Sequence, residues 1–323
     1  MKNVLIINEE WAEYFENVGN KYLVVKYTPN TFSNTVREVI LSPEGYTSLM
    51  VVTDYHPRLP DILINGQAVD SSSLIKVEPA PFTHPFCHFS GLFFFSILWL
   101  LNYPEVICTH SYMISIPAKL LTTPEITHIL NEVQTPYAFN LGMVALAIKK
   151  NVPTKPVRIL PHRSSDAFYE ILKTEFIHSS ATLMKVLEIP DTPYDVKNDI
   201  HPIPLSRDEK IEVPGYFFLS KEFTTGFRRY APFWKEHLFE DHFALLSAIY
   251  SGKENAVIDD RIWIRIMFEF INVSLKFEDK TKIARRIFPI YALYLKTVHQ
   301  TPISERFRNY LGILEEESKF LKD

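Results

Sequence analysis

Residues 48–56 read SLMVVTDYH, a short apolar run that ends in an aspartate and a histidine. Val4–Ile7 (VLII) and Tyr22–Lys26 (YLVVK) are similar runs earlier in the chain, and residues 34–41 have the composition of a helix. Short β-branched runs that alternate with helical segments are typical of βαβ units. The sequence therefore predicts an α/β fold with a parallel sheet in its N-terminal part.

Further elements are predicted from the same patterns. Strands are expected over residues 61–65, 74–77 and 106–108, with a turn at Asn65-Gly66, and helices over residues 114–121, 124–133 and 141–149. The most apolar stretch, Phe89–Leu101, reads FSGLFFFSILWLL. It is shorter than the about 20 residues that cross a bilayer, so we expect a buried helix and no membrane span.

The chain after Pro214 changes to helical spacing. Apolar residues recur at i, i+3, i+4, i+7 and i+8 in Trp263, Ile266, Met267, Phe270 and Ile271. Asp259 and Asp260 suit the start of that helix. Two more stripes of this kind follow, over residues 287–298 and 303–314. An all-helical C-terminal domain is therefore expected.

Prolines mark the boundary between these parts. They cluster around residues 151–161 and 190–214, and between the clusters residues 165–187 have the spacing of a helix. We expect an α/β domain over residues 1–150, a proline-rich linker with one or two helices over 151–214, and a helical domain over 215–323.

Composition excludes several common classes of protein. Only 9 glycines are present, and the residues after the first strand, Asn8-Glu9-Glu10-Trp11, contain none to hold a phosphate. The P-loop, nucleophile-elbow, HExxH and CxxC motifs are missing from the sequence. A net charge of -4 argues against nucleic acid as a partner. Two cysteines and a short apolar N-terminus favour a cytoplasmic location.

Asp54 and His56 form the first candidate site. They follow an apolar strand, and ligands of α/β sheets bind at the carboxyl ends of strands. An aspartate and a histidine one residue apart can face a divalent cation that clamps a diphosphate. This D-x-H pattern resembles a metal-binding motif of some nucleotide-sugar glycosyltransferases. The alternative is a turn in which both side chains cap backbone groups before Pro57.

A second candidate is a group of nitrogen and sulfur donors of the kind that zinc selects, namely His84, Cys87, His88, Cys108 and His110. His84 and His88 are also candidates for a catalytic acid or base near Asp54. In the alternative interpretation the cysteines are small buried apolar residues and the histidines fill core or loop positions. A divalent metal ion is the only cofactor that the sequence suggests.

A third candidate is a basic series in the helical part. Arg228, Arg265, Arg285 and Arg286 could bind a phosphate or carboxylate of the substrate if their helices align. The alternative is a solvated helix face. Aromatic residues lie among them, but their helical spacing places most of these rings in the core.

Three segments of the helical part carry a family resemblance: FRRYAPFWKEHL (227–238), DDRIWIRIMFEF (259–270) and FPIY (288–291). Together they resemble the helical tail of some family 2 and family 81-like nucleotide-sugar glycosyltransferases. The resemblance covers residues 227–291 and implies a transferase with a small-molecule donor and acceptor.

The sequence thus predicts a transferase that uses an activated donor such as a nucleotide sugar. Two alternatives stay open. One is a non-catalytic interaction module that docks a protein partner through its helical domain. The other is a zinc-dependent enzyme centred on residues 84–110.

Overall fold

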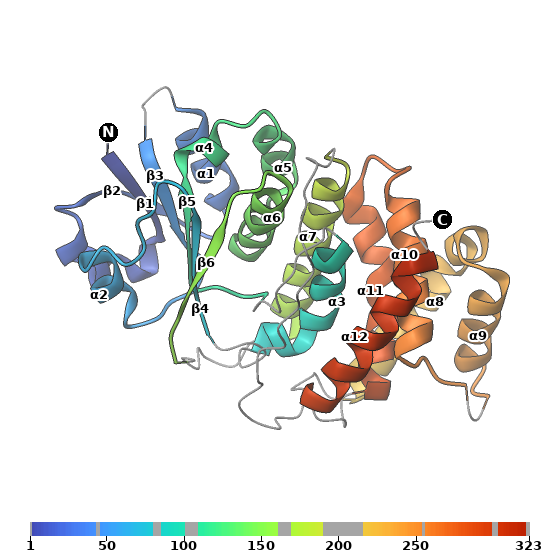
Figure 1. Cartoon of the computed structure of the whole chain (residues 1–323). Helices are drawn as coiled ribbons and strands as arrows, with labels where there is room; N and C mark the ends of the chain where they lie inside the picture. Colours follow the sequence, from blue (N-terminus) through green and yellow to red (C-terminus); the bar gives the residue numbers. More distant parts are fainter. Residues whose placement is uncertain are drawn as a thin grey trace.

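The computed structural model describes residues 2–42, 46–79, 85–100, 109–160, 169–189, 216–253, 256–298 and 303–320. A six-stranded sheet lies at one end of the molecule and a group of helices at the other (Figure 1). The strands are β1 (Lys2–Asn8), β2 (Tyr22–Tyr27), β3 (Tyr46–Val52), β4 (Leu74–Glu78), β5 (Met113–Pro117) and β6 (Thr154–Arg158). Their order is β2-β1-β3-β5-β4-β6, and only β5 runs antiparallel to its neighbours. The predicted α/β fold with a mostly parallel sheet is confirmed.

Both faces of the sheet are covered, which explains why the central strands β1 and β3 read as continuous apolar runs. Val4 and Ile6 of β1 point to one face, where α1 (Phe32–Leu41), α5 (Ile126–Glu132) and α6 (Pro136–Lys149) contribute to the core. Leu5 and Ile7 point to the other face, which is covered by the 3-10 helix η1 (Glu9–Val18) and by α2 (Leu59–Ile64). The sheet therefore forms the middle of three layers.

Two predicted elements are corrected. Residues 61–65, expected as a strand, form the end of helix α2 and its C-cap Asn65, because Pro60 suits the first turn of a helix and Leu59, Ile62 and Leu63 bury one face of it. Residues 114–121, expected as a helix, divide into strand β5 and the short helix α4 (Ala118–Leu121). Periodicity does not separate a short buried strand from a buried helix, which is the reason for this error. The predicted strand at 106–108 lies outside the described residues.

Strand β6 lies within the segment expected to be a linker. It pairs in parallel with β4, and its Pro156 is opposite Lys76. Proline cannot donate a backbone hydrogen bond, but β6 is the last strand of the sheet and, among the residues that the structure describes, has a neighbouring strand on one side only. The prolines of this segment led to the expectation of a linker. They are compatible with β6 because an edge strand tolerates proline.

The helical part confirms the expected all-helical C-terminal region. It comprises α8 (Tyr216–His237), α9 (Glu240–Tyr250), α10 (Asp260–Ser274), α11 (Lys280–Val298) and α12 (Ile303–Phe320). The predicted helix start at Asp259 is also confirmed, since its carboxylate accepts a hydrogen bond from the Ile262 amide at 2.8 Å.

Helix α7 (Tyr169–Leu187) joins the two parts. It packs against α6 on one side and α11 on the other, and α3 (Pro85–Leu100) also contacts it (Figure 1). Phe176 of α7 stacks on Tyr291 of α11 with ring centroids 4.7 Å apart. A single apolar cluster therefore runs from the sheet through α7 into the C-terminal helices. Within the described ranges, no helix is long and apolar enough to cross a membrane.

Candidate functional site

Asp54 and His56 lie just beyond β3, at the edge of the sheet where the parallel strands end. Strand β1 lies between β2 and β3, so the connections that leave β1 and β3 diverge at this edge. Such a switch point is where open α/β sheets bind ligands. The position that the sequence suggested for Asp54 is therefore a suitable one.

Asp54 is part of a buried polar cluster. Its Oδ1 accepts a hydrogen bond from the Tyr55 amide at 2.8 Å, and its Oδ2 accepts one from the Tyr137 hydroxyl at 3.3 Å. The Nε2 atom of His110 lies 3.6 Å from the same Oδ2, and His110 is fully buried. The His110 ring also contacts Tyr112 and Tyr137. Segments from β3, β5 and α6 thus meet at this carboxylate.

His56 caps backbone groups at the same edge. Its Nδ1 accepts a hydrogen bond from the Arg58 amide at 3.1 Å, so Nε2 carries the proton and donates to the Leu160 carbonyl at 2.9 Å. Both ring nitrogens are engaged, as the capping interpretation of the sequence expects. A metal ion at His56 would have to displace one of these backbone groups, and the D-x-H metal site stays a prediction.

Two more titratable groups lie beside this cluster. Burial, followed by the charges of Asp54 and Glu175, raises the pKa of Tyr27 far above its ordinary value. Burial also raises the pKa of Glu175 to about 8, although the Thr135 hydroxyl donates a hydrogen bond to its carboxyl group at 2.5 Å. The folded protein therefore favours the neutral form of Glu175.

The predicted zinc ligands are described only in part. His110 lies beside Asp54, whereas His84, Cys108 and the side chains of Cys87 and His88 lie outside the described residues. In the part of the chain that the structure describes, no three His, Cys, Asp or Glu side chains are grouped to hold a metal ion. The zinc site, and the roles of His84 and His88 as acid or base, stay predictions.

The four predicted substrate-binding arginines have different neighbours. Arg228 donates to the Tyr250 hydroxyl at 3.1 Å, and the guanidinium of Arg286 lies 3.9 Å from the centre of the Phe233 ring. Arg285 is exposed on α11, where its charge adds to burial in lowering the pKa of His178. Arg265 alone of the four lines the cavity described next.

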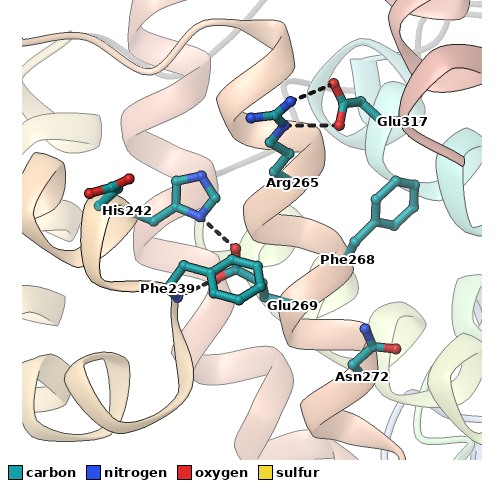
Figure 2. A pocket seen from close by; sticks show the side chains of 8 residues that line it. Phe239, His242, Arg265, Phe268, Glu269, Asn272 and Glu317 are labelled. Carbon is teal, nitrogen blue, oxygen red and sulfur yellow. Dashed lines mark hydrogen bonds and ion pairs between the residues drawn. The ribbon is translucent and has the colours of Figure 1, made fainter. Parts of the chain in front are cut away.

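A cavity of about 610 Å³ lies among α9, α10 and α12, at the end of the molecule away from the sheet (Figures 1 and 2). It is partly open to solvent and is lined by Phe239, Asp241, His242, Arg265, Phe268, Glu269, Asn272 and Glu317. Its volume falls within the range of about 300–1,000 Å³ that is common for small-molecule sites.

His242 and Glu269 form a pair in this cavity. The Nδ1 atom of His242 is 2.5 Å from Oε1 of Glu269, while Oε2 accepts a hydrogen bond from the Phe239 amide at 3.0 Å. Glu269 is 9% exposed, so one nearly buried carboxylate holds both the imidazole and the start of α9. The carboxylate fixes the proton on Nδ1 and leaves a lone pair on Nε2 of neutral His242. Figure 2 shows this second nitrogen pointing away from Glu269.

Arg265 forms the opposite wall. Its Nε and Nη2 donate to the two carboxylate oxygens of Glu317 at 2.9 and 3.1 Å, and Arg261 donates to Glu317 at 2.6 Å. Burial alone would raise the pKa of Glu317, but the hydrogen bonds from Arg265 and Arg261 hold that pKa below its ordinary value. The third nitrogen of Arg265, Nη1, is on the side away from Glu317 and nearer His242 (Figure 2).

Sequence reasoning found Arg265 but missed His242 and Glu269, which lie 27 residues apart in the chain. The sequence contained one indication of this site. Arg265, Glu269 and Asn272 recur at i, i+4 and i+7 and form a polar strip on helix α10, whose other face is apolar. A polar strip at helical spacing inside an apolar segment indicates a site or a buried network.

No protein-family model and no curated protein sequence matches this chain. The interpretation of the cavity therefore rests on its own geometry and on the chemistry of its side chains.

Proposed function

We propose that the protein is a transferase that activates the hydroxyl group of an acceptor in the helical cavity, with His242 as the general base and Glu269 as its positioning residue. The observation that carries the proposal is the orientation of the imidazole. A carboxylate holds Nδ1, and in the neutral imidazole this leaves the lone pair on Nε2, beside a cavity of small-molecule size. An imidazole oriented by a carboxylate is a recurrent way to remove a proton from a hydroxyl group.

The reaction class comes from the family resemblance. The segment that resembles the helical tail of nucleotide-sugar glycosyltransferases, residues 227–291, contains every residue that lines the cavity except Glu317. That resemblance implies a nucleotide sugar as the activated donor.

The proposed step transfers one proton and exchanges one bond. Nε2 of His242 takes the hydroxyl proton of the acceptor, and the acceptor oxygen attacks the anomeric carbon of the donor. A carbon–oxygen bond forms there, and the bond from that carbon to the phosphate oxygen breaks. The nucleoside diphosphate leaves with the electron pair. The imidazolium that forms is stabilised by the Glu269 carboxylate and returns its proton to solvent.

The test is the turnover of nucleotide sugars by purified protein in the presence of a mixture of hydroxylated acceptors, followed as release of nucleoside diphosphate. His242→Gln is expected to lower kcat by about 10²- to 10⁴-fold, the usual contribution of a general base. Glu269→Gln should also lower kcat, because an amide oxygen that accepts from the Phe239 amide leaves the amide nitrogen facing Nδ1 of His242, which favours the tautomer with the proton on Nε2.

His128→Gln is the matched control, since His128 is exposed on α5 and does not line the cavity. It should leave turnover unchanged. The proposal is wrong if wild-type protein consumes none of the donors, or if a folded His242→Gln variant keeps wild-type kcat.

A further inference from the structure

We infer that the helical cavity binds its acceptor as a neutral polyhydroxylated ring, of the sugar or cyclitol class, and that the phosphates of the donor stay outside it. The inference rests on the proposed function, because it names the acceptor of the same site. Three properties of the cavity wall support it: its charge, its free hydrogen-bonding groups and its aromatic rings.

The charge of the wall disfavours phosphate. Three carboxylates, those of Asp241, Glu269 and Glu317, face one guanidinium, that of Arg265. Glu317 already occupies the Nε and Nη2 edge of Arg265, which is an edge that could otherwise form a two-point contact with a phosphate. Arg261 also pairs with Glu317, so three carboxylates lie near two guanidinium groups. A phosphorylated ligand would meet this excess of negative charge and would lack that arginine edge.

The free polar groups of the wall match hydroxyl groups. Nε2 of His242 and the carboxylate of Asp241 accept hydrogen bonds, Nη1 of Arg265 donates them, and the Asn272 amide does both. A hydroxyl group also donates and accepts, so a ring that carries several of them can use all four side chains. An ammonium group only donates, and it would face the positive charge of Arg265.

The carboxylates of the wall give a further reason to prefer a neutral ligand over a cation. Both oxygens of Glu269 and both oxygens of Glu317 already accept hydrogen bonds from the protein. Only Asp241 is left to pair with a ligand cation, and it is exposed to water, where an ion pair contributes little.

Two aromatic rings complete the wall. Phe268 is 4% exposed, whereas Phe239 is 70% exposed although it is a large apolar side chain. The C–H face of a sugar ring is apolar and can pack on such a ring while its hydroxyl groups reach the polar side chains. An acceptor of this class would cover Phe239.

The test measures binding without donor, by ligand-observed NMR or calorimetry. The probes are methyl glucoside, methyl galactoside, methyl mannoside and myo-inositol as neutral rings, glucosamine as a cation and glucose 6-phosphate as an anion. At least one neutral ring should bind in the millimolar range or tighter, that is, with a Kd of about 1–10 mM or below. Its affinity should exceed that of glucosamine and glucose 6-phosphate by about 10-fold or more.

Variants place the bound probe in the cavity. Asn272→Ala and Asp241→Asn should each weaken neutral-ring binding by about 3- to 10-fold, the effect of one lost hydrogen bond. Asn309→Ala and Glu240→Gln are the matched controls, since both residues are exposed and neither lines the cavity. They should leave affinity unchanged.

Three results would each overturn the inference: no neutral ring binds at about 10 mM, a charged probe binds more tightly than every neutral ring, or the Asn272 and Asp241 variants bind as wild type does. The two proposals fail separately. Neutral-ring binding that needs Asn272, without any donor turnover, would keep the inference and remove the transferase. Turnover that needs His242 but uses a phosphorylated acceptor would do the reverse.

Discussion

Glu175 shows how one residue can make stability depend on pH. It extends from α7 to the Thr135 hydroxyl at the start of α6, and burial raises its pKa to about 8. The folded state therefore favours the neutral form, whereas the unfolded chain ionises near the ordinary value of 4.5. The stability that neutral Glu175 contributes is complete below that ordinary pKa. It is lost as the pH rises through the interval up to about 8.

Glu175→Gln should remove this dependence, because the amide is neutral at every pH and can still accept the Thr135 hydrogen bond. The wild-type free energy of unfolding should fall relative to the variant by on the order of 1 kcal/mol per pH unit across that interval. Urea unfolding of both proteins at about pH 5 and about pH 9 measures the difference. Equal pH dependence of the two proteins would show that Glu175 ionises freely in the folded state.

Sequence patterns located single residues where their role is local. The cap at Asp259 and the polar end of β3 at Asp54 depend on neighbours along the chain, and both were predicted in place. The pairing of His242 with Glu269 depends on how α9 packs on α10. Local spacing contains no information on that contact, so the sequence indicated Arg265 without its surroundings.

At the scale of elements, the contact between α8 and α11 depends on Gly226. A Cβ atom added there would lie 2.3 Å from Cβ and 2.4 Å from Cγ of Pro289, a ring that cannot rotate away. The two helices approach this closely only because residue 226 has no side chain.

Gly226→Ala should therefore destabilise the protein by about 1–3 kcal/mol, the usual cost of overpacking a core. Gly312→Ala in α12 is the matched control. Its Cβ would meet no atom within 4 Å, and the higher helix propensity of alanine should stabilise the protein by up to about 1 kcal/mol. Chemical denaturation of both variants gives the comparison, and a stable Gly226→Ala protein would mean that α8 and α11 pack farther apart.

The lengths of the helices and strands explain which of them the sequence predicted. Long amphipathic helices such as α10 and α11 were found because their stripes persist over several turns. Among the short elements, the strands β2 and β4 were predicted but three others were not. The strand β5, the helix α2 and the edge strand β6 have five or six residues, too few for their apolar pattern to tell a strand from a helix. Their identity is set by the sheet and the layers around them.

At the scale of the whole molecule, the two parts share one apolar cluster through α7. Unfolding of either part would expose α7 and the apolar surface of the remaining part that packs against it. We therefore expect both parts to unfold in one transition. Trp11 in η1 and Trp263 in α10 are natural probes, one in each part.

Labelling with 5-fluorotryptophan gives one fluorine NMR signal for each of the four tryptophans during a urea titration, and Trp11→Phe and Trp263→Phe identify the two probes among them. The resonances of Trp11 and Trp263 should disappear at the same urea concentration. Two distinct midpoints would instead show that the α/β part and the helical part unfold independently.

The antiparallel strand β5 has a consequence for the order in which the nascent chain can complete its sheet. Strands β1, β2 and β3 are neighbours, so this half can pair once residue 52 has left the ribosome. Strand β4 follows in sequence, but among the described strands its hydrogen-bonding partners are β5 and β6 alone. It must wait unpaired until more than thirty further residues, up to β5, are synthesised. During that interval a strand that the folded protein buries completely is available to chaperones or to other nascent chains.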